Sequence, residues 1–411
     1  MKRGLSLVLS LCFLFLLSGI SRAEDITDPI LKKLVEKGIL TEQEAKSVMK
    51  EMAKEPAAEK KATELSVDEQ KDLSKIAKAL KGVKIGGLWY LSYQNGQSGG
   101  SNFNKFDIKR GYLTVEKEIA PWFQARVTTD VTTVKDATSN LDGSFSLRLK
   151  YIYGQFNIPD IAFFTKPNVE VGMVHMPWLD FEEHVNYYRM QDTMFIERNG
   201  IFNSADIGIT VSSLLGGYVN EDYRKNVNSA YPGRYGSVQF GLYNGGGYAA
   251  SEKNENKVAE GRLTIRPLPD VIPGLQLTYF GLTGKGNKDT NPGWTANVGM
   301  ASFEHEYVVL TGQYYAGKGN QKGDDENDRK GYSFFTEVKP HKKFSLIGRF
   351  DHFDPNTDKS DDTNNRYMAG VAYHIDKQHK NMVLLDYDAV NYDQPGKKDD
   401  KRAQLTLQVA F

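Results

Sequence analysis

Basic side chains recur on the polar face of segments whose residues alternate between apolar and polar. Leu113 and Val115 share one face of such a segment, so Arg110 lies on the other face, and Arg126 opposes Ala125 in the same way. Guanidinium and ammonium groups offer positive charge and several N–H donors, which together replace part of the hydration shell of an anion. The cations that alternation assigns to this wet surface are Arg110, Arg126, Arg148, Lys150, Arg262, Arg266 and Arg349. They predict a path for small inorganic anions or other small solutes.

Acidic side chains occupy the same polar faces and offer a second interpretation. The chain has 52 Lys and Arg against 52 Asp and Glu. Cations that pair across the wall with acids would brace a broad pore rather than select a solute. The acids in question are Glu116, Asp130, Glu260, Asp351 and Asp386. We favour this pairing over strict selectivity, with a mild anion preference near Arg110, Arg126, Arg148 and Lys150.

The segments that carry these residues have the two-residue period of β-strands from residue 83 to the end. Short and long polar connections alternate between them, which is typical of a transmembrane antiparallel β-barrel. If residues 214–235 form an enlarged turn, the chain has about 16 strands, whereas 18 is the alternative. The candidate strands are 83–94, 107–118, 122–134, 145–158, 168–176, 205–213, 236–245, 258–268, 274–285, 294–304, 306–317, 331–339, 343–353, 366–376, 380–392 and 402–411.

The last candidate strand separates its two faces clearly. Leu405 and Leu407 share one face with the terminal Phe411, whereas Gln404 and Thr406 share the other. An apolar outer face and a polar inner face are expected of a barrel in lipid. A chain that ends on a strand with a terminal aromatic residue resembles the signal by which the barrel-assembly machinery recognises its clients. We therefore assign Phe411 as the membrane-insertion signal.

Residues 1–23 have the pattern of a cleaved secretory signal peptide. Lys2 and Arg3 form a basic start, an apolar run follows, and small residues precede Ala23. Cys12 is the only cysteine and lies in this peptide, so the mature chain is expected to have no thiol. The resulting domain prediction is 1–23 signal peptide, 24–81 periplasmic segment and 82–411 barrel.

Residues 24–81 differ in composition from the rest and have helical rather than strand periodicity. Thr41 and Glu44 form a capping-box pattern at the start of one predicted helix. The segment predicts a short α-helical periplasmic unit. Subunit association, cell-wall contact or spacing are all open as its role.

The connection at 177–204 is long and unusually aromatic for a solvated loop. A loop folded into the barrel as a constriction would explain both its length and its rings. Its candidate constriction residues are Glu182, Glu183, Tyr187 and Arg189. The alternative is a loop that packs on the outer rim or on a neighbouring subunit.

Several motifs resemble those of the phosphate-selective porin O/P family. The opening hairpin, a strand that ends in Met176 and Pro177, the Phe195-Ile196-Glu197-Arg198 stretch and the strand that follows it carry the resemblance. The segments are 83–90, 106–115, 121–126, 169–177, 195–198 and 205–209.

The resemblance implies trimeric 16-stranded porins, some of which carry anions along arginines that line the lumen. The basic pair of the family's second strand falls on Lys109 and Arg110, so the resemblance implies that Lys109 belongs to the same path for anions. The family often has two arginines there, and Lys109 lacks the two-pronged geometry that suits phosphate. The resemblance therefore implies a porin more strongly than it implies phosphate.

The sequence offers little for other kinds of chemistry. The seven histidines are scattered without the spacing of metal ligands, and we expect them at the surface or in the aromatic girdles. No nucleophile motif, cofactor motif or basic patch for nucleic acid stands out. We predict neither an enzyme nor a metal or cofactor site.

These features together predict an outer-membrane porin for passive diffusion of small hydrophilic solutes or ions, with anion or phosphate preference open. Its expected partners are two further copies of the chain, outer-membrane lipid and lipopolysaccharide, and the assembly machinery. One alternative is a barrel sheath around an electron-carrying cytochrome. A less favoured alternative is an outer-membrane hydrolase.

Overall fold

A computed structural model describes residues 28–52, 72, 74–77, 80–134, 138–376 and 380–411. The predicted signal peptide lies outside the described residues. The chain divides into two compact units at residues 81 and 82. In the described part of the chain, no helix is both long and apolar enough to cross a membrane.

The first unit contains helix α2 (Pro29–Glu36) and helix α3 (Glu42–Met52). The Asp28 carboxylate caps α2 by accepting from two backbone N–H groups of its first turn. At α3 the Thr41 hydroxyl accepts from the Glu44 N–H at 3.2 Å, and the Glu44 carboxylate accepts from the Thr41 N–H at 2.8 Å. The predicted capping box is therefore confirmed.

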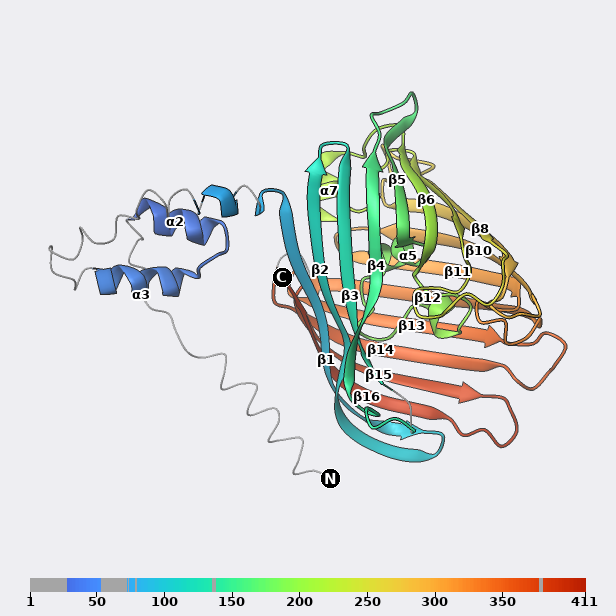
Figure 1. Cartoon of the computed structure of the whole chain (residues 1–411). Helices are drawn as coiled ribbons and strands as arrows, with labels where there is room; N and C mark the ends of the chain where they lie inside the picture. Colours follow the sequence, from blue (N-terminus) through green and yellow to red (C-terminus); the bar gives the residue numbers. More distant parts are fainter. Residues whose placement is uncertain (1–27, 53–71, 73, 78–79, 135–137, 377–379) are drawn as a thin grey trace. The chain divides into compact units, whose positions relative to one another are not determined.

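The described residues of the second unit form sixteen antiparallel strands that close into a barrel, with β1 paired to β16. This confirms the predicted all-β barrel and its strand number. Figure 1 shows the strands in chain order around the ring. Their bounds are β1 Val83–Ser98, β2 Ser101–Ala120, β3 Phe123–Thr133, β4 Phe145–Asn157, β5 Phe164–His175, β6 Ala205–Leu215, β7 Gly236–Tyr243, β8 Val258–Ile265, β9 Leu275–Lys285, β10 Gly293–Glu304, β11 Val308–Lys318, β12 Asp328–His341, β13 Phe344–Asp354, β14 Asn364–His374, β15 Met382–Tyr392 and β16 Asp400–Ala410.

Side chains alternate between the inside and the outside of the barrel. On β16 the side chains of Gln404 and Thr406 are buried inside, whereas Leu405 and Leu407 are partly exposed outside. On β8 Leu263 is exposed outside and Arg262 is buried inside. An apolar outer surface of this kind is suited to lipid.

The connections differ between the two ends of the barrel. The end with the brief links between β2 and β3 or β12 and β13 is called the turn end below, and the opposite end the loop end. Residues 216–235, at the turn end, contain the short helix α7 (Glu221–Asn226) and no further strand. The predicted enlarged turn is therefore confirmed.

The first hairpin is longer than predicted. Residues 95–105 were expected to form a polar loop, but β1 and β2 pair through to Ser98 and Ser101. Gly99 and Gly100 both have positive φ angles, of 57° and 83°, which permit a two-residue turn in line with the twist of the strands. The polar composition of this segment thus reflects a hairpin that extends into solvent.

Two β-bulges alter the alternation of inward side chains. The register between β1 and β2 shifts at Lys109, and the register between β3 and β4 shifts at Lys150. A bulge inserts one extra residue into a strand, so two consecutive side chains can face the same side. Lys109 and Arg110 both point inward for this reason, as do Lys150 and Tyr151.

Candidate channel lumen

The connection between β5 and β6 folds into the barrel. This segment, residues 176–204, is called the inner loop below, and it contains helices α5 (Leu179–Val185) and α6 (Phe195–Arg198). Its Pro177 carbonyl accepts from Arg262 on β8 at 2.9 Å, and its Met190 carbonyl accepts from Lys109 on β2 at 2.7 Å. These strands lie far apart around the ring, so the inner loop must cross the interior. Figure 1 shows α5 within the strands.

Apolar packing explains why the inner loop turns inward. The side chains of Trp178, Phe181 and Phe195 are almost fully buried. Trp178 packs on Phe280 of β9, and Trp294 of β10 belongs to the same apolar cluster. A buried aromatic side chain removes roughly 150–250 Å² from water, so this core is a strong driving force. It fills the interior beside β9–β13.

Charged contacts tie the inner loop to the opposite strands. The Asp192 carboxylate accepts from Arg366 of β14 at 2.5 Å and from Arg402 of β16 at 2.8 Å. Both guanidinium groups also pair with Asp388 of β15. Burial alone would raise the pKa of Asp192, but the surrounding guanidinium groups hold that pKa well below its usual range. Asp192 therefore anchors the inner loop as an ionised carboxylate.

Lys109 holds the tip of the inner loop by its ammonium group. The Nζ donates to the carbonyl oxygens of Met190 and Gln191, each at 2.7 Å, and to the amide oxygen of Gln404 at 3.0 Å. These three bonds use all three N–H donors of a lysine. The planar fork of an arginine has a different geometry, which gives a physical reason for lysine at this position.

The inner loop contacts the inner face of β2 directly. Arg189 pairs with Glu183 at 2.6 Å and with Glu197 at 2.9 Å, and it donates to the Tyr112 hydroxyl at 2.6 Å. Arg110 of β2 lies 3.7 Å from Glu197. The inner loop thus presents charges of both signs to the inner face of β2, and these charges pair with one another.

The predicted cations fall into two groups by exposure. The side chains of Arg110, Arg126 and Arg148 are 20%, 25% and 32% exposed, although all three point inward. Arg262 and Arg349 are only 1% and 6% exposed, because the inner loop covers them. Solvent therefore reaches the inner face of β2–β4, which is called the open wall below. Lys150 and Arg266 are buried like Arg262.

The open wall carries its arginines at two levels. Arg148 lies opposite Asp130, whose carboxylate accepts from it at 2.7 Å. Arg126 lies four residues along β3, about 13 Å at the usual rise of a strand. It lies 3.8 Å from Glu116 and 5.1 Å from the centre of the Tyr151 ring. At one level Arg148 therefore combines with a carboxylate and with Tyr248. At the other level Arg126 combines with a carboxylate and with Tyr151.

The predicted pairing of cations with acids holds for part of the set. Asp130 and Glu116 pair with open-wall arginines, and Asp351 pairs with Arg349 at 2.9 Å. Glu260 accepts no hydrogen bond from any described residue, and Asp386 accepts from the Gln404 amide instead of an arginine. The bracing interpretation thus describes the open wall and Asp351 better than it describes β8 and β15.

Two of the four predicted constriction residues face the open wall, and the other two face β11 and β12. Arg189 and Glu183 face the open wall, as described above. Glu182 instead accepts from the Trp178 indole and from Gln313 of β11, and the Tyr187 hydroxyl donates to a carboxylate on β12. Glu182 is buried. The structure thus places two of the four against β2, and their role as a constriction stays a prediction.

Several residues of the site were missed by the sequence analysis. Arg366 and Arg402, which anchor Asp192, alternate with outward residues and could have been found by the same rule. Tyr248 reaches Arg148 from a loop, with its hydroxyl 3.1 Å from Nη2, and loops give no such signal. The expectation that the histidines lie at the surface or in the aromatic girdles is wrong for two of them. His175 and His374 are buried, paired with Glu170 and Ser345 respectively.

Phe411, the predicted insertion signal, lies just beyond β16 at the turn end. Its ring is 63% exposed and contacts Trp89 edge-on, with 5.3 Å between ring centres. This position is compatible with recognition of the chain end, but the signal itself stays a prediction.

The fold resembles solved outer-membrane porins. The anion-selective porin from Comamonas acidovorans matches with a TM-score of 0.56 at 10% identity, over 80% of this chain and 99% of that chain. A loop-deletion form of OmpT, an outer membrane protein of Vibrio cholerae, matches with 0.53 at 9% identity, over 80% and 99%. The outer membrane channel DcaP of Acinetobacter baumannii matches with 0.51 at 12% identity, over 80% and 97%.

At these identities the matches bear on the fold alone, and they support the closed sixteen-stranded barrel described above. No protein-family model and no curated protein matches the sequence. The resemblance to phosphate-selective porins therefore stays a prediction.

Proposed function

We propose that the chain is an outer-membrane channel through which small hydrophilic solutes diffuse passively along the open wall. The observation that carries this proposal is the partial exposure of Arg110, Arg126 and Arg148 inside a barrel whose interior beside β9–β13 is filled by the inner loop. In this proposal the inner loop sets the width of the path, and the open wall sets its electric field.

We propose a mild preference for anions rather than tight binding of phosphate. Arg110 and Arg148 share Asp130, and Arg126 has Glu116 nearby. A guanidinium group that already pairs with a carboxylate has less to offer a phosphate. The proposed current is therefore anion-leaning and is not blocked by phosphate at low concentration.

The proposal includes the location and the assembly of the chain. Secretion by the predicted signal peptide and insertion in the outer membrane accord with the barrel, and a homotrimer accords with the trimer form of OmpT from Vibrio cholerae, which has a similar fold. The trimer is checked by the mass of the purified protein before and after heating in detergent.

The alternative function as a cytochrome sheath requires an open interior. The inner loop and its apolar core occupy the interior beside β9–β13. This arrangement weighs against a sheath and favours a narrow channel.

The test is the reversal potential of the refolded protein in planar bilayers under a KCl gradient. We expect an anion-leaning potential that moves toward zero in Arg126→Ala, with the conductance retained. Arg262→Ala is the matched control, since Arg262 is buried under Pro177 and should affect stability but not selectivity. An unchanged potential in Arg126→Ala would refute the role of the open wall, and an absence of current in the wild type would refute the channel.

A further inference from the structure

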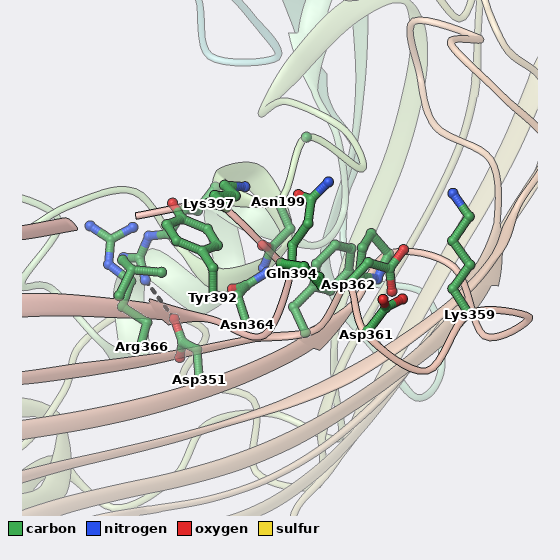
Figure 2. A pocket seen from close by; sticks show the side chains of 16 residues that line it. Asn199, Asp351, Lys359, Asp361, Asp362, Asn364, Arg366, Tyr392, Gln394 and Lys397 are labelled. Carbon is green, nitrogen blue, oxygen red and sulfur yellow. Dashed lines mark hydrogen bonds and ion pairs between the residues drawn. The ribbon is translucent and has the colours of Figure 1, made fainter. Parts of the chain in front are cut away.

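A second cavity lies at the loop end of the barrel, away from the open wall. Its volume is about 780 Å³. Its lining comes from α6, from β13–β15 and from the connections 355–363 and 393–399, and none of it comes from β2–β4. Figure 2 shows its charged side chains. A cavity of this size holds a ligand larger than a simple ion.

One side of this cavity offers cationic donors. Figure 2 shows Arg366, Tyr392 and Lys397 together on that side. The Nε and Nη2 of Arg366 bind Asp388 and Asp192, whereas its Nη1 donates to no described group. The Nζ of Lys397 lies 3.7 Å from the centre of the Tyr392 ring and pairs with no carboxylate of the described residues. Both cations are thus available to an anionic group.

The other side offers carboxylates. Asp361 and Asp362 lie there, on the connection between β13 and β14 (Figure 2). Neither forms an ion pair with a cation of the described residues. The Oδ1 of Asp362 is shielded from solvent and accepts no hydrogen bond from another described residue, although Lys359 also lines this side of the cavity. A shielded carboxylate oxygen without a donor is costly, and a cationic N–H group would relieve that cost.

The lining between the two charged sides is partly apolar. Phe353 and Val390 are buried at its base, and Pro355 and Pro395 contribute to its walls. A simple anion would satisfy only Arg366 and Lys397, and a simple cation would satisfy only the acids. A ligand with one charge of each sign and an apolar group between or beside them fits all three surfaces.

We propose that this cavity binds a short zwitterionic peptide. The peptide carboxylate lies toward Arg366 and Lys397, the ammonium group lies on Asp361 and Asp362, and an apolar side chain packs on Phe353. The cavity is a capture site at the mouth, and it neither requires nor replaces the conduction path along the open wall.

The test uses the full-length protein in detergent and isothermal titration with the dipeptide alanyl-phenylalanine. Two capped forms serve as matched probes: the N-acetyl peptide lacks the ammonium group, and the C-terminal amide lacks the carboxylate. Each cap removes one charge-assisted contact, so each should weaken binding by about tenfold or more.

The double variant Asp361→Asn/Asp362→Asn separates the proposed contact from a general effect. The double variant should bind the free dipeptide only as weakly as wild type binds the N-acetyl form, and its affinity for the N-acetyl form should equal that of wild type. This is expected for two changes that remove the same interaction. Asp289→Asn, an exposed loop residue on another connection, is the control and should bind like wild type.

Three results would overturn the proposal: equal binding of free and capped peptides, unchanged binding by the double variant, or no binding by the wild type. The conductance of the same samples keeps the two proposals apart. A conducting protein that does not bind the dipeptide overturns the capture site alone. A protein that binds it but does not conduct supports the capture site and refutes the channel.

Discussion

The ring of Phe411 lies directly over Gly87, at the seam where the barrel closes. The two residues exchange backbone hydrogen bonds of 3.0 and 3.2 Å, and a Cβ on Gly87 would lie 2.4 Å from the ring. The absence of a side chain on Gly87 therefore makes the place for the terminal ring, which also contacts Trp89.

We expect Phe411→Ala to lower both the stability of the seam and the yield of folded barrel. Loss of the contact with Trp89 alone should cost about 1 kcal/mol. Gly87→Ala should displace the ring and have a smaller effect of the same sign. The measurement is the folded fraction in lipid vesicles, read from gel mobility without heating. Wild-type yields for Phe411→Ala would contradict both the packing role and the insertion signal.

Lys109→Met should release the tip of the inner loop. The change leaves the Met190 carbonyl without the Lys109 donor, which costs about 1–3 kcal/mol, whereas the Gln191 carbonyl still accepts from Gln404 and Arg402. We expect larger and noisier single-channel currents. Lys109→Arg should restore the wild-type currents only in part, because the planar fork of arginine does not reach the same three acceptors. Complete rescue by arginine would show that charge alone matters at this position.

Asp192→Asn should loosen the inner loop on its other side. Arg366 and Arg402 would lose a shared carboxylate that is mostly shielded from water. Breaking such a pair costs about 3 kcal/mol when it is buried and less when solvent screens it. The expected outcome is faster cleavage of the inner loop by added protease, with the barrel intact. Asp289→Asn, which is exposed, controls for the loss of one charge.

Glu182 should make the packing of the inner loop inside the barrel more stable at acidic than at alkaline pH. Burial is the main reason that the pKa of Glu182 rises to about 7, and the nearby Arg349 opposes this rise. An acid whose pKa is raised on folding contributes stability below its unfolded value near 4.5, and this contribution is lost as the pH rises toward 7. Glu182→Gln, which is always neutral, should flatten this part of the unfolding profile between pH 4.5 and 7. A variant profile parallel to wild type would exclude Glu182 as the cause.

Alternation in the sequence was enough to predict the sixteen strands and most of the inward cations. It could not predict the bulges at Lys109 and Lys150, since an extra residue becomes visible only when the partner strand is aligned. Strict alternation would turn either Lys109 or Arg110 outward, and it would turn Tyr151 outward too. For the first pair, the family resemblance carried information that periodicity lacked.

The side on which the inner loop packs was equally hidden from the sequence. Its aromatic residues indicated burial, but the surface that receives them consists of inward apolar residues such as Phe280 and Trp294. On β9 the inward Phe280 and Leu282 are as apolar as the outward Leu277, so periodicity there does not distinguish lipid contact from internal packing. The division between exposed Arg126 and buried Arg262 follows from that packing and is a tertiary property.

The inner loop and the open wall belong to different parts of the chain, and this has a consequence for how such a channel can change. The loop is attached at a single neck, where Met176 meets Ser204. The arginines stand on β2–β4, which the neck does not include. In the proposed channel the loop and the strands can therefore vary separately: an exchanged loop would alter the largest solute admitted and, because Glu197 lies 3.7 Å from Arg110, the charge beside β2, whereas Arg126 and Arg148 stay with the strands.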